Sequence, residues 1–420
     1  MRISSFSARL VCCCLAALWL SSAHGGDWPQ FLGPQRNGTS AETGLLKLLA
    51  TGPASTLWEV PLGTGMSGIA ISNGRAYTLF QTETEQFAVA LDAATGKQLW
   101  KTALAPAYEN SMGNGPRATP TVVADRVFVY TGEGILAALQ TSDGKVLWSV
   151  NVPKSLAGQP NEYGCSCSPI VVDKLVIVQS GTENAATAAW NVETGKPVWK
   201  SGSGNAGYSS PTLATLAGKQ QLLVFNAAGA AGLDPQTGQE LWDFPFPTEY
   251  DCNTATPVVL NDSEVLISAG ENHGAVILEV ANTGAALAVK PVWESLGKDS
   301  QLRAEWQTPV VHDGHLYALD NSGSAGPITN LVCIRLADRT TVWQKTRFGK
   351  SNLILADGRL WFTTMKGELV LVDASPEAYR ELGRIEVLQT TRQAPTLANG
   401  LLYVRDDQKL VCLDVRAKGK

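Results

Sequence analysis

Two pairs of residues in the sequence have side chains and spacing that could bind a metal ion. Cys165 and Cys167 flank a single serine, and His312 and His315 flank an Asp-Gly pair. A soft metal site needs more ligands than two thiols, and Asp-Gly is typical of a hairpin turn that would carry the histidines into solvent. We therefore expect buried or unreactive thiols and a solvated loop at these positions, without a bound metal.

The remaining patterns also predict no catalytic centre. Residues 202–207 read GSGNAG, the G-x-G-x-x-G spacing of a dinucleotide-binding loop. This segment precedes a strand-like stretch, so no helix N-terminus is available to a phosphate. No C-x-x-C-H haem motif occurs, and no spacing suggests a Ser-His-Asp or Cys-His set. Any chemistry must come from residues that the fold brings together.

The elements that would bring them together form a repeat. Segments such as ALDAATGKQLW (90–100) and AWNVETGKPVW (189–199) recur, and their tryptophans are separated by 42, 48, 51, 43, 51 and 50 residues. A period of this length indicates a repeat architecture. The set consists of Trp58, Trp100, Trp148, Trp199, Trp242, Trp293 and Trp343.

Each repeat has the pattern of four short antiparallel strands. Between the tryptophans, β-branched and aromatic residues alternate and are interrupted by turn signals, as in TPTVVADRVFVYTGEG (119–134). No segment has a sustained helical period. We therefore predict an all-β propeller, in which each D-x-x-T-G turn sets the strand register and each tryptophan fills the wedge between neighbouring blades.

Proline positions indicate how many blades there are. A proline is tolerated at the first residue of a strand because its missing N–H costs no ladder hydrogen bond. We expect innermost strands to begin at Thr119-Pro120, Ser168-Pro169, Ser210-Pro211, Thr256-Pro257, Thr308-Pro309 and Ala394-Pro395. The count gives eight blades, the last of which takes its fourth strand from the segment around Trp58, so that both chain ends close the ring. A seven-bladed ring is the alternative if residues 344–415 are divided differently.

The amino end has the features of a secretory signal peptide. A basic segment, MRISSFSAR, is followed by the short apolar run LVCCCLAALWL and the small residues SSAHG. No later stretch is long and apolar enough to span a membrane, so we expect an exported protein, periplasmic or extracellular. The predicted parts are a signal peptide (1–25), an N-terminal extension (26–54), a single propeller (55–416) and a tail (417–420).

The net charge and the number of cysteines argue against two features, a nucleic-acid partner and a disulfide framework. The net charge is −5 and becomes more negative once the signal and its two arginines are removed. Nucleic acid is therefore not an expected partner. The five cysteines that remain are an odd number, which argues against a disulfide framework in an oxidising compartment. We expect a monomer.

The repeated A-x-D-x-x-T-G-x-x-x-W pattern resembles the tryptophan-docking repeat of pyrroloquinoline-quinone (PQQ) dehydrogenase propellers, over about residues 55–415. The segments DWPQFLGPQRNGTS (27–40), GKSNLILADGRLWF and VDASPEAYREL resemble exported PQQ-like propeller proteins of planctomycete-type bacteria. A more distant similarity is to the BamB-type propeller lipoprotein of the outer-membrane β-barrel assembly machinery, which binds partners and has no catalysis. A shared fold does not transfer function.

The resemblance to the dehydrogenases implies a site over the central channel, where a calcium ion and the quinone would lie. It places the calcium-binding glutamate at Glu183 and the catalytic base at Asp251, and carboxylates suit calcium. The matching asparagine is out of frame at Asn226, and the adjacent cysteine pair beneath the quinone is interrupted by Ser166. We therefore expect no cofactor, with PQQ and calcium as the alternative.

The first functional hypothesis is an exported, non-catalytic propeller that binds a protein or an extended ligand on one face of the ring. The inter-blade loops at 105–117, 153–164, 245–253 and 294–306 would form this face. Candidate anchors are Tyr108, Tyr163, Tyr250, Arg303 and Trp306. The alternatives are a small PQQ- and calcium-dependent alcohol or sugar dehydrogenase, and an assembly factor that augments the strands of outer-membrane proteins.

Overall fold

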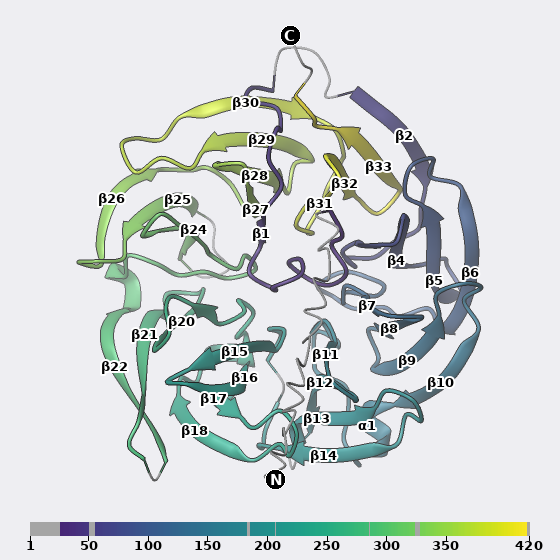
Figure 1. Ribbon diagram of the computed structural model, residues 1–420, viewed down its shortest axis with the longest axis horizontal. Coiled ribbons are helices and arrows are strands. Elements are labelled where there is room, and N and C mark those ends of the chain that lie inside the picture. Colours follow the sequence, from purple (N-terminus) through teal and green to yellow (C-terminus); the bar gives the residue numbers. More distant parts are fainter. Residues whose placement is uncertain are drawn as a thin grey trace, which may run out of the picture.

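The computed structural model describes residues 26–49, 55–182, 185–205, 207–284, 286–323 and 328–417. They form a closed ring of eight four-stranded blades around a central channel (Figure 1). The prediction of an all-β, eight-bladed propeller is confirmed, and the seven-bladed alternative is wrong. The predicted signal peptide lies outside the described residues.

The first four blades follow one another along the chain, each running from the channel outward. Their strands are β3 (Ala70–Ser72), β4 (Arg75–Gln81), β5 (Glu85–Asp92) and β6 (Gln98–Pro106); β7 (Thr121–Val123), β8 (Arg126–Tyr130), β9 (Ile135–Gln140) and β10 (Val146–Asn151); β11 (Ile170–Val172), β12 (Leu175–Thr182), β13 (Ala185–Asn191) and β14 (Pro197–Ser201); and β15 (Thr212–Leu216), β16 (Lys219–Asn226), β17 (Gly229–Leu233) and β18 (Glu240–Pro245). The six predicted proline positions each directly precede an innermost strand.

The other blades have the same order, with two variations. Their strands are β19 (Val258–Val259), β20 (Glu264–Ala269), β21 (Gly274–Asn282) and β22 (Leu287–Leu296); β23 (Val310–His312), β24 (His315–Ser322), β25 (Ile328–Arg335) and β26 (Thr340–Lys345); β27 (Ser351–Ala356), β28 (Arg359–Thr364), β29 (Glu368–Asp373) and β30 (Glu381–Glu386); and β31 (Thr396–Ala398), β32 (Leu401–Arg405), β33 (Lys409–Asp414) and β2 (Ser55–Pro61). Helical structure in the described residues is limited to α1 (Val152–Ser155) and the 3-10 turns η1 (Glu249–Asp251) and η2 (Gly297–Asp299).

The two ends of the chain close the ring in the eighth blade, as predicted. β2 pairs with β33 in antiparallel register, with Trp58 opposite Cys412 and Val60 opposite Leu410. The outermost strand of this blade therefore comes from the start of the propeller and the three inner strands from its end. This arrangement completes the eighth blade, so that the inner part of its sheet has no unpaired strand edge.

Four outer-strand tryptophans dock on the glycine-containing turn that joins the third and fourth strands of the next blade. The Trp100 indole N–H donates to the Thr141 carbonyl oxygen at 2.9 Å. A Cβ atom on Gly144 would lie 2.5 Å from this indole, so the glycine is required for the close approach. The same contact recurs between the indoles of Trp58, Trp148 and Trp199 and the glycines Gly96, Gly195 and Gly238.

The docking contact changes where the repeat is degenerate. The turn of the fifth blade keeps a glycine, Gly284, but an added Cβ there would meet no atom within 4 Å, so no indole docks on it. The Trp242 indole N–H donates instead to Gln221 Oε1 within its own blade, at 2.5 Å. The seventh blade has a different turn, yet the Trp343 indole N–H still donates to the Ser375 carbonyl oxygen at 3.0 Å. The hydrogen bond of the indole N–H is therefore retained at interfaces where the indole–glycine contact is absent.

The ring has two unlike faces, because successive links in an antiparallel blade alternate between them. The turn face carries the short turns that join the first strand to the second and the third to the fourth, such as 73–74 and 93–97. The loop face carries the links between second and third strands and all connections between blades. These connections are 62–69, 107–120, 152–169, 202–211, 246–257, 297–309, 346–350 and 387–395.

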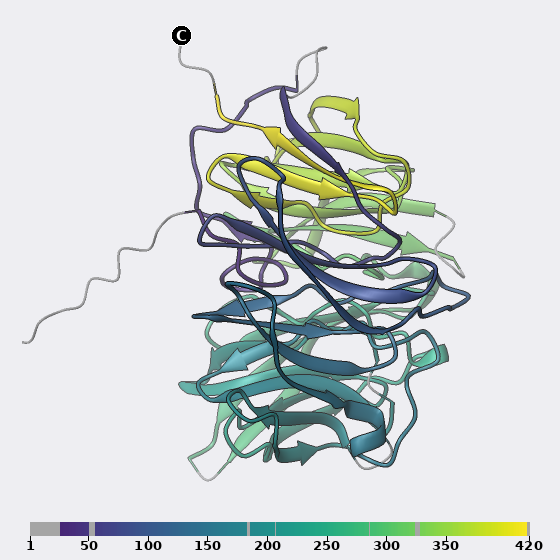
Figure 2. The same cartoon turned by 90° about the vertical axis from the view of Figure 1, so that its right-hand side faces the viewer.

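Residues 27–40, which we call the channel plug, enter the ring from the turn face. Asp27 Oδ2 accepts a hydrogen bond from the backbone N–H of Asn73 at 3.1 Å, in a turn of blade one. After the plug, the chain returns to the same face, where the backbone N–H of Leu45 donates to Asp357 Oδ2 at 3.0 Å. Figure 2 shows this purple segment on the left side of the disc.

Backbone hydrogen bonds fix the plug to several innermost strands. The N–H and carbonyl groups of Trp28 pair with those of Ile71 at 2.9 and 2.8 Å. The carbonyl oxygen of Pro29 accepts from the N–H of Val122 at 2.8 Å. β1 (Thr39–Ser40) adds a parallel fifth strand to blade seven beside β27, at the centre of Figure 1. The extension thus becomes part of the channel wall.

Candidate functional site

One buried cation adds to the backbone hydrogen bonds that hold the plug in the channel. The Arg36 side chain is 4% exposed and donates to three backbone carbonyl oxygens: those of Pro211 at 2.9 Å, Pro169 at 3.0 Å and Ser168 at 3.0 Å. These carbonyls belong to two different blades. Burial lowers the pKa of Arg36 to about 10, so its guanidinium remains charged at neutral pH.

The plug is also the floor of a pocket that opens on the loop face. The cavity has a volume of about 230 Å³. Its floor is formed by Trp28, Phe31 and Leu32 of the plug. Its walls are the first residues of the innermost strands and the connections that lead into them, and they include Met66, Ile69, Met112, Arg117, Thr119, Tyr163, Ser166, Ser168, Tyr208, Ser210, Cys252, Thr254, Trp306, Asn352, Arg392, Gln393 and Thr396.

One repeat position supplies most of the ring of side chains around this pocket. The residue three positions before the proline that opens each innermost strand faces the cavity in six blades. These residues are Arg117, Ser166, Tyr208, Thr254, Trp306 and Arg392. Sequence reasoning used the prolines to count blades and missed this position, although the proline register would have found it.

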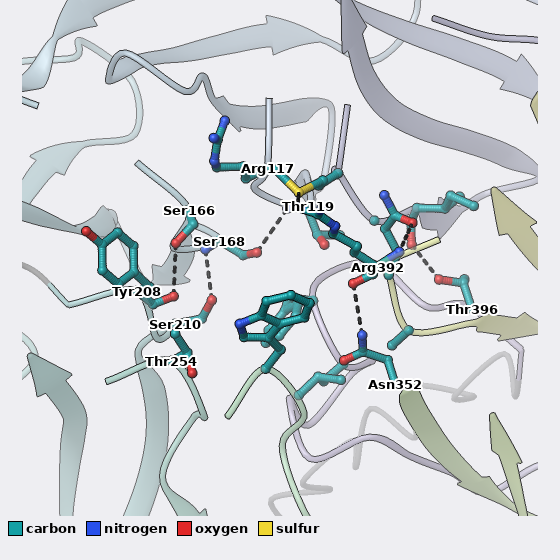
Figure 3. Close-up of a pocket in the computed structure, with 18 of the residues that line it drawn as sticks. Arg117, Thr119, Ser166, Ser168, Tyr208, Ser210, Thr254, Asn352, Arg392 and Thr396 are labelled. Carbon is teal, nitrogen blue, oxygen red and sulfur yellow. Dashed lines mark hydrogen bonds between the residues drawn. The ribbon is translucent and has the colours of Figure 1, made fainter. Parts of the chain in front are cut away.

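Deeper in the channel, a second ring of hydroxyl groups is already hydrogen-bonded. The Ser168 hydroxyl accepts from the backbone N–H of Thr119, and the Ser210 hydroxyl accepts from that of Ser168, both at 2.9 Å (Figure 3). The Thr396 hydroxyl donates to the carbonyl oxygen of Ile69 at 2.8 Å. These groups link neighbouring blades, so their polar atoms are occupied by the protein itself.

Two arginines face the pocket from blades two and eight (Figure 3). The Arg117 guanidinium donates to the carbonyl oxygens of Gly115 at 2.5 Å and Gly113 at 2.7 Å, and lies 5.0 Å from the Tyr108 ring centroid. Burial lowers the pKa of Arg117, and the neighbouring Arg392 cation acts in the same direction. The two positive charges therefore affect each other.

Arg392 extends over the pocket next to an indole. Its guanidinium carbon is 5.5 Å from the Trp306 ring centroid, and Nη1 donates to Met66 Sδ at 3.4 Å and to the Met112 carbonyl oxygen. The Lys350 ammonium is 4.2 Å from the same centroid. One side of the pocket is therefore cationic and aromatic.

The predicted anchor residues have different positions. Trp306 and Tyr163 line the pocket, and Tyr108 packs beside it against Arg117. Tyr250 is 63% exposed on the loop face. Arg303 is buried, and its guanidinium forms a bidentate ion pair with Asp320 at 2.7 and 2.8 Å. Because this pair is internal, Arg303 cannot contact a partner without breaking it.

Of the residues predicted as calcium ligand and base, only Asp251 lies in the described part of the chain. Glu183 lies outside the described residues. Asp251 accepts a hydrogen bond from Asn205 Nδ2 on the loop face and does not line the pocket. No aspartate or glutamate is among the described pocket residues, which include two arginines, so this lining does not fit calcium. The described residues contain no cluster of three potential metal ligands.

Cys165 and Cys167 are buried in the wall of blade three, and both are free thiols. Burial raises the pKa of Cys165 to about 11 and that of Cys167 to about 12, so both are protonated at neutral pH. A protonated, enclosed thiol is a poor nucleophile and a poor metal ligand.

No described helix is long and apolar enough to cross a bilayer.

Comparison with known proteins identifies relatives of two kinds. The chain is 26% identical over 242 residues to the outer membrane protein assembly factor BamB of Shewanella oneidensis, a match that covers 51% of this chain and 56% of that protein. It is 22% identical over 358 residues to BamB of Yersinia pestis, with 83% and 75% covered. The quinohemoprotein alcohol dehydrogenase ADH IIB of Pseudomonas putida is 31% identical over 123 residues, only 17% of its length. The match thus spans little more than half of the first relative.

Solved structures of both kinds share the fold. Quinohemoprotein alcohol dehydrogenase from Comamonas testosteroni superposes with a TM-score of 0.71 at 13% identity, over 96% of this chain and 82% of that one. BamB from Moraxella catarrhalis superposes with a TM-score of 0.60 at 13% identity, over 87% and 99%. At this identity the similarity shows a common architecture.

A protein-family model described as outer membrane protein assembly factor BamB matches residues 44–114 and 88–345, most of the propeller. The chain therefore belongs to this family of PQQ-like β-propellers.

Proposed function

We propose that this protein is an exported, non-catalytic propeller that binds a protein partner across its loop face during the assembly of outer membrane proteins. Family membership supports the assembly role, since the BamB relatives carry that description. The pocket supports a binding role over a catalytic one, because its described lining offers no carboxylate or free thiolate as a base or nucleophile.

The observation that carries the proposal is the difference between the two faces. On the turn face the links are short and the plug segment is fastened over the channel. The loop face has the long connections, and apolar side chains are exposed in them and at the strand ends beside them: Met112 is 41% exposed, Tyr250 63%, and Leu296, the last residue of β22, 49%. Exposed aromatic and apolar side chains on one face are typical of a protein-binding surface.

Site-specific cross-linking in cells tests the proposed face. A photoreactive residue would replace Met112, Tyr250 or Leu296 on the loop face. Leu147 and Val198 on the outer strands serve as controls, because they are 39% and 51% exposed. We expect adducts with outer membrane assembly proteins from the loop-face positions only.

Adducts from Leu147 or Val198 alone would contradict the loop-face proposal. They would support strand augmentation, because these residues lie on β10 and β14, whose outer edges are unpaired in the described blades. Loss of capture in a Tyr250→Ala, Leu296→Ala double variant, with unchanged thermal stability, would give independent support. Such a variant removes contact surface and no internal hydrogen bond.

A further inference from the structure

We infer that the loop-face pocket is a binding site for an organic carboxylate with a flat apolar body. The carboxylate would lie between Arg117 and Arg392, and the apolar body would pack against Trp306 and the plug. This inference concerns a carboxylate bound in the pocket, and it does not depend on the protein partner proposed for the loop face.

The charge of the pocket favours an anion. Neither guanidinium lies within ion-pair distance of a carboxylate among the described residues, although most other arginines of the ring are paired. Arg392 and Arg117 occupy the same repeat position in blades eight and two, flanking Met66 of blade one. Two partly buried like charges without a counter-ion are costly, and a bound anion would relieve this cost.

The donors that remain have the geometry for a carboxylate. Arg117 uses one N–H of each terminal nitrogen for the Gly113 and Gly115 carbonyls. Arg392 uses only Nη1, so its Nε and Nη2 make no hydrogen bond within the described residues. A guanidinium edge with two parallel N–H groups matches the two oxygens of a carboxylate.

The rest of the pocket favours an apolar, planar body. The hydroxyls deeper in the channel are engaged between blades, which leaves few polar atoms for a ligand. The floor is Trp28, Phe31 and Leu32, and the Trp306 indole lines one wall. A volume of about 230 Å³ can hold a ring system of this kind.

The other explanation of the arginines is structural, since Arg117 caps two loop carbonyls. A purely structural role requires no ligand and predicts no selectivity for charge. The two explanations therefore differ in whether a neutral amide of the same shape binds as well as the acid.

Binding measured by calorimetry on the full chain separates them. The probes are 2-naphthoate, a free aromatic acid, and acetyl-Gly-Phe, which presents the same chemistry as a peptide C-terminus. Their neutral amides are the matched ligands. We expect the acids to bind at least about tenfold more tightly than the amides, and more weakly as salt increases. Tighter binding of 2-naphthoate would identify the carboxylate as that of a free aromatic acid, and tighter binding of acetyl-Gly-Phe would identify it as that of a peptide C-terminus.

Variants locate the site. Arg392→Gln should weaken acid binding at least about tenfold, because a charge-assisted hydrogen bond is lost, and Trp306→Leu should weaken both acids and amides. Arg347→Gln is the control, since Arg347 is exposed on the loop face and does not line the pocket. Equal binding of acids and amides, no binding of either acid, or an equal effect of Arg347→Gln would overturn the inference. Arg392 is tested in preference to Arg117 because it donates to one backbone carbonyl oxygen, whereas Arg117 donates to two.

Discussion

Replacement of Arg36 by methionine tests whether the plug is an integral part of the ring. Methionine keeps most of the length and apolar character of the side chain but removes the donors to Ser168, Pro169 and Pro211. Hydrogen bonds to a charged group contribute about 1.5–3 kcal/mol each, so the three bonds at 2.9 to 3.0 Å represent roughly 5 to 9 kcal/mol.

Part of this contribution offsets the burial of a charge. Burial lowers the pKa of Arg36 from 12.5 to about 10, which corresponds to a penalty of roughly 3 kcal/mol. The difference leaves a net stabilisation of about 2 to 6 kcal/mol. At about 2.1 cal/mol/K of unfolding entropy per residue, Arg36→Met should lower the Tm of a chain this long by about 2 to 7 °C.

Thermal unfolding and hydrogen exchange of residues 28–40 are the assays. Arg36→Met should speed exchange in the plug more than in the outer strands, and Arg36→Lys should give an intermediate result, because an ammonium cannot reach three divergent carbonyls. Arg380→Met is the control, since Arg380 forms an exposed ion pair with Asp373. If Arg36→Met melts within 1 °C of the parent and plug exchange is unchanged, this account of the plug is refuted.

Three further predictions concern the docking turns, the thiols and the cofactor. Gly144→Ala should destabilise the protein by about 1 to 3 kcal/mol more than Gly314→Ala, as measured by denaturant unfolding: both glycines have φ above +70°, but only the added Cβ of Gly144 meets an indole. Equal costs would show that backbone conformation alone requires the glycine. The folded-state pKa values of Cys165 and Cys167 are raised from 9.0 to about 11 and 12, so the folded state holds protons that the unfolded state loses above pH 9. Stability should therefore fall as pH rises from about 9 towards 11, and a Cys167→Ala variant should show a shallower fall; a parallel decline in both proteins would contradict this assignment. PQQ and calcium added to the purified protein should give no calcium-dependent, dye-linked oxidation of an alcohol or sugar, because no described pocket side chain is a calcium-binding carboxylate; activity above background would contradict the non-catalytic proposal.

The blade count could be predicted because its signals are local in the sequence. A tryptophan and its turn are a few residues apart, and the same pair recurs in each repeat. The period of the repeat and the register of its strands can therefore be predicted without knowledge of any long-range contact. The closing strand was also predictable, since one repeat had three strands and the segment around Trp58 had no partner.

The plug could not be predicted in the same way. Arg36 bonds to carbonyls of residues 168–211, and nothing around Arg36 in the sequence distinguishes a buried arginine from a solvated one. Arg303 shows the opposite error: its loop position suggested an exposed anchor, whereas its partner Asp320 lies in a strand of the same blade. Both cases depend on contacts between side chains and distant residues, which composition and periodicity do not encode.

The pairing of β2 with β33 also has a consequence for how the molecule is made. The last blade cannot be completed until β33 has been synthesised. Pairing between the first and last strands gives a high contact order, which slows folding. During that delay the leading strand has an open edge that could pair with another copy. We therefore expect the protein to depend on chaperones before β33 pairs with β2 and to become resistant to aggregation once this pairing has formed.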